Sequence, residues 1–164
     1  GSYKLQRPFN IAYRTLSPIA EDFLAFMFSS QGQSIVAKSG YIAVSEGERY
    51  VAGSASGKLA ISGSSSVYPL MEKLIEAYKS LNPLSDITLQ QSDSSTGVKD
   101  VINGISDIGM ASRDLKQSEL DSGIVSRPIA IDGIAVIVNK ENVISDITLD
   151  KLREIYLGQK TTWN

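Results

Sequence analysis

Hydroxyl side chains occur at three places where an apolar run gives way to a helix-like pattern. These places are Ser64-Ser65-Ser66 in ISGSSSVYPL, Ser94-Ser95-Thr96 in SDSSTG, and Ser112-Arg113 in MASRDL. The start of a helix offers unpaired backbone N–H groups and the positive end of the helix dipole, and hydroxyl groups add further donors. Arg113 would add a fixed positive charge with a fork suited to phosphate or sulfate oxygens. Together these residues could bind a compact oxyanion.

Helix capping is the alternative explanation for the same residues. Ser and Thr are favoured N-cap residues, so capping alone explains any single turn better than a binding site does. Three successive turns with more hydroxyls than a cap requires favour a site. For Arg113, a surface ion pair with Asp114 or Glu119 is as good an explanation as a ligand contact. We interpret Asp93 and Asp107 as caps or turn formers, because the clustered oxygen spacing of a calcium site is missing, and we expect no metal and no cofactor.

The composition removes several classes of function. The 164 residues contain no histidine and no cysteine, which excludes a Ser-His-Asp triad and thiol chemistry. A serine hydrolase would need a lysine such as Lys99 as its base, and no motif places that lysine beside a serine. The net charge of −2 and the absence of a basic run argue against nucleic acid or an anionic membrane as the partner. No segment approaches the ~18 apolar residues of a membrane span, and Gly1-Ser2 looks like an expression scar.

Strand-like and helix-like patterns alternate from residue 58 onward. We expect strands at 7–14, 58–62, 86–91, 107–112, 124–131 and 133–140, helices within 17–38, 67–81, 98–104, 113–123 and 148–158, and a linker at 45–57. The helix 67–81 should bury Leu70, Leu74, Ile75 and Tyr78. This alternation predicts an α/β fold in which a mainly parallel sheet is covered on both faces. The hydroxyl turns would then meet at the carboxyl ends of the strands, where Gly63 and Gly97 allow close backbone approach.

Several of these stretches together resemble a known family. GKLAISGSSSVYPLMEKLIEAY, SSTGVKDVINGISDIGMASRDL and ITLDKLREIYLGQKTTWN resemble the first lobe of the phosphate-binding protein of a bacterial ABC phosphate importer. This resemblance covers residues 58–164. The residues 3–44 resemble the end of the same family's chain. The resemblance implies a three-layer α/β/α lobe of the periplasmic-binding-protein type II fold, with a mainly parallel five-stranded sheet and an antiparallel strand.

The two pieces stand in the reverse of the family's order. In the family the piece similar to 58–164 comes first, a second lobe follows, and the piece similar to 3–44 comes last. We therefore expect a single lobe over residues 1–164 in circularly permuted order, joined through 45–57 and without the second lobe. An engineered permuted lobe and a segment of a natural rearranged protein both fit this order.

The resemblance implies a non-enzymatic solute-binding role outside the membrane, at the cell surface or in the periplasm. The expected partners are inorganic phosphate, the membrane permease of the importer in the full-length context, and a second lobe or another copy of the chain. By motif, the phosphate-binding residues would be Ser64, Ser65, Ser66, Ser94, Ser95, Ser112 and Arg113.

The third turn departs from the family pattern. Many members carry Asp after Ala-Ser, where this chain has Ser112 or Arg113 depending on a one-residue gap, and Asp114 is a possible substitute as acceptor of a phosphate proton. Half of a site should bind phosphate weakly, in the millimolar range or below detection. The alternative is a structural or protein-interaction module that reuses the lobe without binding a ligand.

Overall fold

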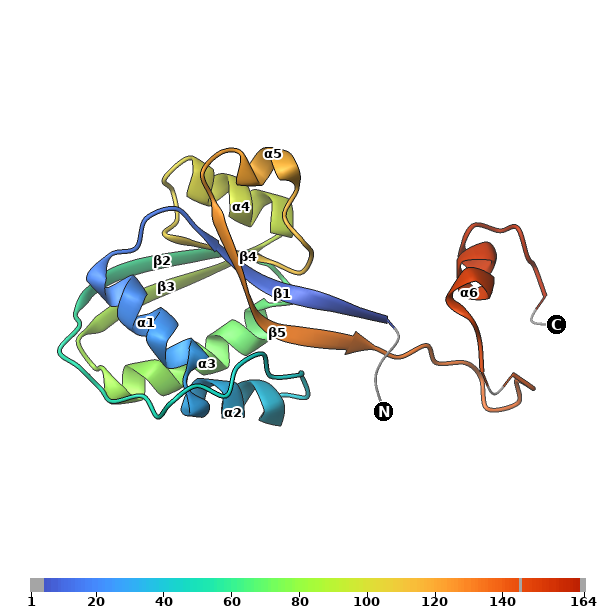
Figure 1. Cartoon of the computed structure of the whole chain (residues 1–164), viewed down its shortest axis with the longest axis horizontal. Coiled ribbons are helices and arrows are strands. Elements are labelled where there is room, and N and C mark those ends of the chain that lie inside the picture. The colour runs from blue at the N-terminus through green and yellow to red at the C-terminus, as the bar shows by residue number, and fades with distance from the viewer. Residues whose placement is uncertain (1–4, 145, 163–164) are drawn as a thin grey trace. The chain divides into compact units, whose positions relative to one another are not determined.

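The computed structural model describes residues 5–144 and 146–162, and it has strands and helices in alternation (Figure 1). In chain order the elements are β1 (Leu5–Tyr13), α1 (Pro18–Phe28), α2 (Ser30–Lys38), β2 (Gly57–Ser64), α3 (Tyr68–Leu81), β3 (Ser85–Ser92), α4 (Ser94–Ile102), β4 (Ile108–Ala111), α5 (Gln117–Leu120), β5 (Val125–Ile134) and α6 (Leu149–Tyr156). None of the helices in these residues is long and apolar enough to cross a membrane.

The five strands form one sheet in the order β3-β2-β4-β1-β5. Strand β2 pairs in parallel with both β3 and β4, whereas β1 pairs antiparallel with β4. The predicted five-stranded sheet with an antiparallel strand is therefore confirmed. The parallel register sets Ser64 opposite Ser92 and Gly63 opposite Met110, so the carboxyl ends of β2, β3 and β4 lie at one edge of the sheet.

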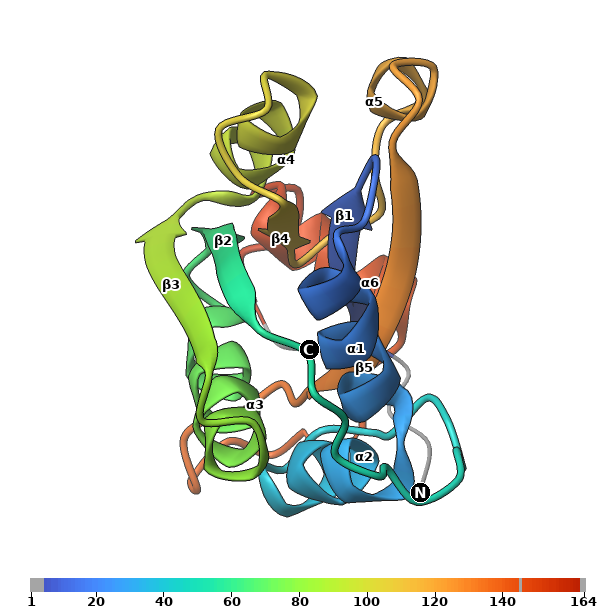
Figure 2. The same ribbon diagram turned by 90° about the vertical axis from the view of Figure 1, so that its left-hand side faces the viewer.

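Helices cover both faces of the sheet (Figure 2). Successive strand residues point to opposite faces: Met110 belongs to the large core with α1 and α3, and Ala111 to a smaller core with Val98 and Val101 of α4. The predicted apolar face of α3 is buried, since its four residues are at most 7% exposed: Leu70, Leu74, Ile75 and Tyr78. The three-layer α/β/α prediction is confirmed.

Glycines bring α4 into direct backbone contact with the sheet. A Cβ on Gly97 would lie 2.6 Å from the Cα of Gly63 and 2.8 Å from the carbonyl oxygen of Ser62. A Cβ on Gly63, whose φ is +132°, would lie 2.4 Å from the carbonyl oxygen of Met110. Gly97 therefore allows α4 to lie close to β2, and Gly63 allows β2 to lie close to β4. The contact of α4 with β2 fixes the first turn of α4 at the carboxyl end of β2.

The segment 45–56, predicted as linker, has no regular secondary structure but is fixed by its contacts. The side-chain amide of Gln31 binds both backbone polar groups of Tyr50. It accepts from the Tyr50 N–H at 2.7 Å and donates to the Tyr50 carbonyl at 3.0 Å. The Tyr50 hydroxyl donates to Asp22 at 2.6 Å and accepts from Asn82 at 2.9 Å. This segment is a strap packed on α1, α2 and the end of α3.

The prediction of two strands at 124–131 and 133–140 is wrong. A single strand, β5, runs through Asp132-Gly133 and ends at Ile134, and the residues 135–140 have no regular secondary structure. A strand needs a neighbour for its backbone N–H and C=O groups. Val136 and Ile137, which are 40% and 90% exposed, have no such neighbour among the described residues.

The chain after Gly133 belongs to a second compact unit, distinct from the unit Gln6–Gly133 that contains most of the sheet. The predicted closing helix is present in this unit as α6, capped by Thr148, whose hydroxyl accepts from the N–H of Lys151. Leu152 is buried, but Tyr156 and Leu157 are 83% and 59% exposed. Several large apolar side chains of this unit are therefore exposed to solvent.

Candidate functional site

The first hydroxyl turn follows β2 and leads into α3. Ser64 is buried, Ser65 is exposed and Ser66 is partly buried. Helix α3 has Val67 at its N-cap and no side chain capping it within the described residues. The capping explanation is therefore wrong for these three serines.

The second hydroxyl turn has a cap of its own. Asp93 accepts from the N–H groups of Ser95 and Thr96 at 2.8 and 3.0 Å, and from the Thr96 hydroxyl at 2.7 Å. These hydrogen bonds, with that from the Thr96 hydroxyl the strongest, lower the pKa of Asp93. The prediction that Asp93 is a cap is confirmed. Since Asp93 caps α4, the hydroxyls of Ser94 and Ser95 are left for other contacts.

The second and third turns are joined to each other. The Ser94 hydroxyl oxygen accepts from the backbone N–H of Ser112 at 3.1 Å and lies 3.4 Å from the Ser112 hydroxyl. A buried residue of β1, Asn10, donates to the carbonyl of Arg113 at 2.9 Å and fixes the chain beyond β4. The sequence interpretation did not include Asn10, although a lone amide in the apolar strand RPFNIAYR is a signal that it binds a specific backbone group.

Arg113 makes a two-pronged ion pair with Glu119. Its two terminal nitrogens donate to the two carboxylate oxygens at 2.9 and 2.8 Å, and Nη2 also donates to the Ser95 hydroxyl at 3.2 Å. The pair raises the pKa of Arg113 and lowers the pKa of Glu119, chiefly through these hydrogen bonds. Of the two ion-pair partners considered from the sequence, Glu119 is the actual one. Asp114 is exposed and contacts Arg113 only through its backbone carbonyl.

Ser95 and Ser94 of the second turn each accept a hydrogen bond from a neighbouring N–H group. A hydroxyl has one donor and two acceptor positions. Ser95 accepts from Arg113, so its hydroxyl proton is available to a further acceptor. Ser94 accepts from the N–H of Ser112, and one proton is shared in its contact with the Ser112 hydroxyl, which leaves the other hydroxyl of that pair able to donate outward. The first turn is adjacent, because the N–H of Ser65 donates to the carbonyl of Ser92 at 3.1 Å. The edge of the sheet thus presents several donors and one neutralised arginine, a set suited to a small oxyanion.

Carboxylates outside this edge have structural contacts. Asp107, interpreted from the sequence as a cap or turn former, accepts from the N–H of Ala60 in β2 at 2.7 Å, which is a long-range contact with a strand rather than a local turn contact. Within residues 5–144 and 146–162, no three acidic side chains come together as a metal site would require. Lys99, the only base considered for a serine hydrolase, is exposed on α4.

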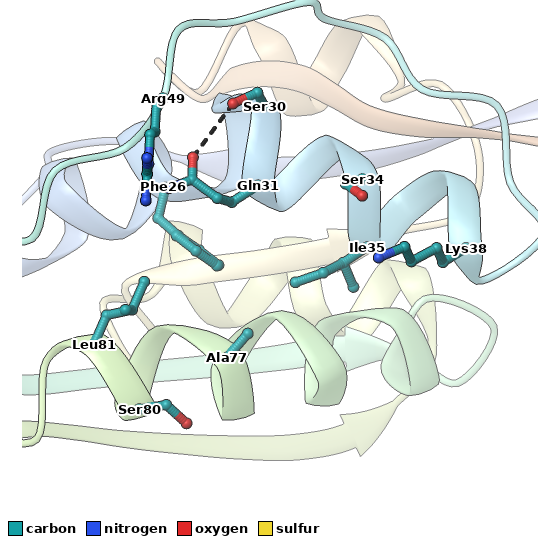
Figure 3. Close-up of a pocket in the computed structure, with 10 residues that line it drawn as sticks. All are labelled: Phe26, Ser30, Gln31, Ser34, Ile35, Lys38, Arg49, Ala77, Ser80 and Leu81. Atoms are coloured by element: carbon teal, nitrogen blue, oxygen red, sulfur yellow. Dashed lines mark hydrogen bonds between the residues drawn. The ribbon is translucent and has the colours of Figure 1, made fainter.

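A groove of about 620 Å³ has a lining separate from the hydroxyl turns. Figure 3 shows its lining residues. The groove runs between α2 and α3, with Phe26, Ile35 and Leu81 contributing apolar surface and Lys38 and Arg49 contributing the two charges. Its lining includes none of the residues predicted to bind an anion. It therefore does not belong to the candidate site.

The comparisons with known proteins agree with this geometry. A family model described as a PBP superfamily domain matches residues 50–164. The phosphate-binding protein PstS 2 of Streptococcus agalactiae serotype V is 45% identical over 166 residues, which cover 100% of this chain and 57% of that protein. The chain thus spans little more than half the length of this curated relative.

Two solved structures are similar. The crystal structure of a phosphate-binding protein of a phosphate ABC transporter from Streptococcus pneumoniae TIGR4 has a TM-score of 0.90 at 43% identity, covering 98% of this chain and 63% of that one. The structure of a putative phosphate ABC transporter substrate-binding protein from Clostridium perfringens, with bound phosphate, has a TM-score of 0.58 at 44% identity, covering 65% and 44%. With a family model matched over residues 50–164, the chain belongs to the PBP superfamily.

Proposed function

We propose that this chain binds inorganic phosphate and forms part of the solute-binding component of an ABC phosphate importer. One observation carries the proposal: the serines at the ends of β2 and β3 lie at helix starts that they do not cap. Ser64, Ser65, Ser66, Ser94, Ser95 and Ser112 would donate hydrogen bonds to the anion, and Arg113 would add a charged donor. Similarity to a Clostridium perfringens protein with bound phosphate supports this choice of ligand.

Phosphate would be held by hydrogen bonds rather than by net charge. Arg113 is already paired with Glu119, so the edge gains little positive charge from it. Hydrogen bonds to a charged group contribute roughly 1.5 to 3 kcal/mol each, and several of them give a usable affinity without enclosure. For this chain alone we expect millimolar binding, since one sheet edge leaves much of the anion in water.

The order of the two pieces would be a natural one. The streptococcal relatives align with the whole chain, whereas the Clostridium perfringens structure covers 65% of it and the family model begins at residue 50. This difference is expected if the streptococcal proteins share the permuted order and the others do not. We propose that 3–44 and 58–164 are consecutive in this branch of the family.

The unit after Gly133 would pack on protein outside this chain. The match covers 57% of the relative from Streptococcus agalactiae, so that protein has further residues. Four large apolar side chains of this unit are exposed: Val136, Ile137, Tyr156 and Leu157. We propose that the remainder of such a protein forms the second lobe, covers these side chains and closes over the phosphate. The whole protein would act outside the cytoplasmic membrane, deliver phosphate to a membrane permease and have no enzymatic activity.

Replacement of Ser65 tests the assignment. Ser65 is exposed and its hydroxyl has no hydrogen bond within the described chain, so Ser65→Ala should leave the melting temperature unchanged. It should weaken phosphate binding about threefold to tenfold, measured by calorimetric or NMR titration, because one donor is lost.

The matched control is Ser80→Ala, an exposed serine in the last turn of α3. It should bind phosphate as the parent does. Equal affinity of the parent and Ser65→Ala would show that the site is misplaced. A parent protein that does not bind phosphate and forms a dimer would instead support the alternative function, a protein-interaction module.

A further inference from the structure

We infer that Glu119 is a positioning residue for the oxyanion site, acting through Arg113. This inference rests on the proposed function. Glu119 lies in the short helix α5, outside the hydroxyl turns, and its carboxylate would not itself attract an anion. Its effect would be to fix where the Arg113 guanidinium and the Ser95 hydroxyl point.

The contacts leave the guanidinium one orientation. Both terminal nitrogens bind the Glu119 carboxylate, and Nη2 reaches on to the Ser95 hydroxyl. Glu119 is fixed in turn by the backbone N–H of Lys116, which donates to Oε2 at 2.7 Å. The side chains of Arg113 and Glu119 are 29% and 13% exposed, so this is not a solvated surface pair. The chain of contacts runs from the backbone of Lys116 to a hydroxyl of the site.

Removal of Glu119 would change the affinity for an anion in two ways, one electrostatic and one geometric, and the two changes oppose each other. Arg113 would carry an unneutralised charge, which by Coulomb attraction alone would tighten the binding of an anion. Arg113 and Ser95 would also lose their fixed orientation, so binding would have to order them, which weakens affinity. We propose that the second effect dominates, because a donor that points away from the anion contributes nothing to its binding.

The direction of the change in phosphate affinity therefore decides the question. In the 164-residue chain, Glu119→Gln should weaken inorganic phosphate binding about tenfold at 0.15 M salt, although it removes a negative charge from beside the site. The control Glu76→Gln changes the net charge equally at an exposed position of α3 and should bind as the parent does. Glu119→Asp keeps the carboxylate with a shorter reach and should recover part of the affinity.

A second measurement separates positioning from general destabilisation. In an Arg113→Ala background, Glu119→Gln should change the affinity no further, because Glu119 acts only through Arg113. The side-chain N–H signals of Arg113 should be sharp and slow to exchange in the parent and in Glu119→Asp, and averaged in Glu119→Gln. These signals do not depend on the proposed ligand.

The possible failures are distinguishable. A parent that binds phosphate, with a Glu119→Gln variant that binds equally well or more tightly, overturns the inference and leaves the proposed function standing. A parent that gives no response to phosphate overturns the proposed function, and with it this role of Glu119. An additional loss on adding Glu119→Gln to Arg113→Ala shows that Glu119 acts by another route and also overturns the inference.

Discussion

Serine is one of the commonest helix caps, and in this chain the serines at two helix starts do not act as caps. Asp93 caps α4, and α3 begins at Tyr68 without a side-chain cap among the described residues. Six hydroxyls therefore remain near one edge of the sheet without a capping role: those of Ser64, Ser65, Ser66, Ser94, Ser95 and Ser112. Ser94 and Ser95 both accept from neighbouring N–H groups, and Ser95 keeps its own proton. A donor-rich edge of this kind is suited to an anion with several acceptor oxygens.

The ion pair of Arg113 with Glu119 should make the protein sensitive to acid. The pKa of Glu119 is lowered in the folded protein, so its contribution to stability is present above the pKa of the unfolded chain and is lost as the pH falls through the folded pKa. The melting temperature should therefore fall as the pH drops below the ordinary glutamate pKa of 4.5, and this fall should be shallower in Glu119→Gln. Melting curves recorded above and below that pH measure it. An equal slope in Glu119→Gln and in the parent would contradict this account of the pair.

The hydroxyl turns could be identified from the sequence, because clusters of Ser and Thr stand out after apolar runs. The residue types did not decide which residue caps each helix, since Asp93 and Ser94 are neighbours and both are good caps. They also left Arg113 with two possible acidic partners. The fold decides both questions, because only Glu119 lies within reach of both guanidinium nitrogens with matched geometry.

At the scale of elements, two kinds of contact hold the site in place. Glycine at positions 63 and 97 lets α4 lie directly on β2, and the strap 45–56 fixes the helices on the other face of the sheet. Tyr50 is the central residue of the strap. Its hydroxyl hydrogen-bonds to Asp22 and Asn82, and its ring centroid lies 6.2 Å from that of Tyr78. Burial, with the hydrogen bond to Asp22, raises the pKa of Tyr50.

Loss of the Tyr50 hydroxyl should destabilise the lobe. In Tyr50→Phe, Asn82 loses an acceptor and Asp22 loses one of its two tyrosine donors, so the free energy of unfolding should fall by about 1 to 3 kcal/mol. The control is Tyr41→Phe, whose hydroxyl has no hydrogen bond within the described residues. Urea unfolding compares the two variants. A cost no greater than that of Tyr41→Phe would mean that the strap is a linker without a structural role.

Most elements follow from the period of their apolar residues, as in α3, where the buried residues recur at helical spacing. The exception is the run GIAVIVNK, which has the composition of a strand but forms one only as far as Ile134. Strand formation depends on a partner as much as on side chains. No local pattern shows whether that partner lies in the same chain.

At the scale of the molecule, the sheet and its helices form one unit and the residues after Gly133 belong to another. This chain spans 57% of the relative from Streptococcus agalactiae, and the second unit exposes apolar residues. The phosphate contacts proposed here all lie in the first unit, within the three turns that follow β2, β3 and β4. Binding to this unit alone is therefore the central claim.

The most direct test is to map phosphate binding on the backbone amides of the 164-residue chain by NMR, with sulfate at equal ionic strength as the comparison. We predict that millimolar phosphate shifts the amide signals of residues 64–67, 94–97 and 112–114 and leaves those around Lys38 and Arg49 in place. Shifts confined to the groove beside Lys38 and Arg49, or no shifts at any concentration, would contradict the account.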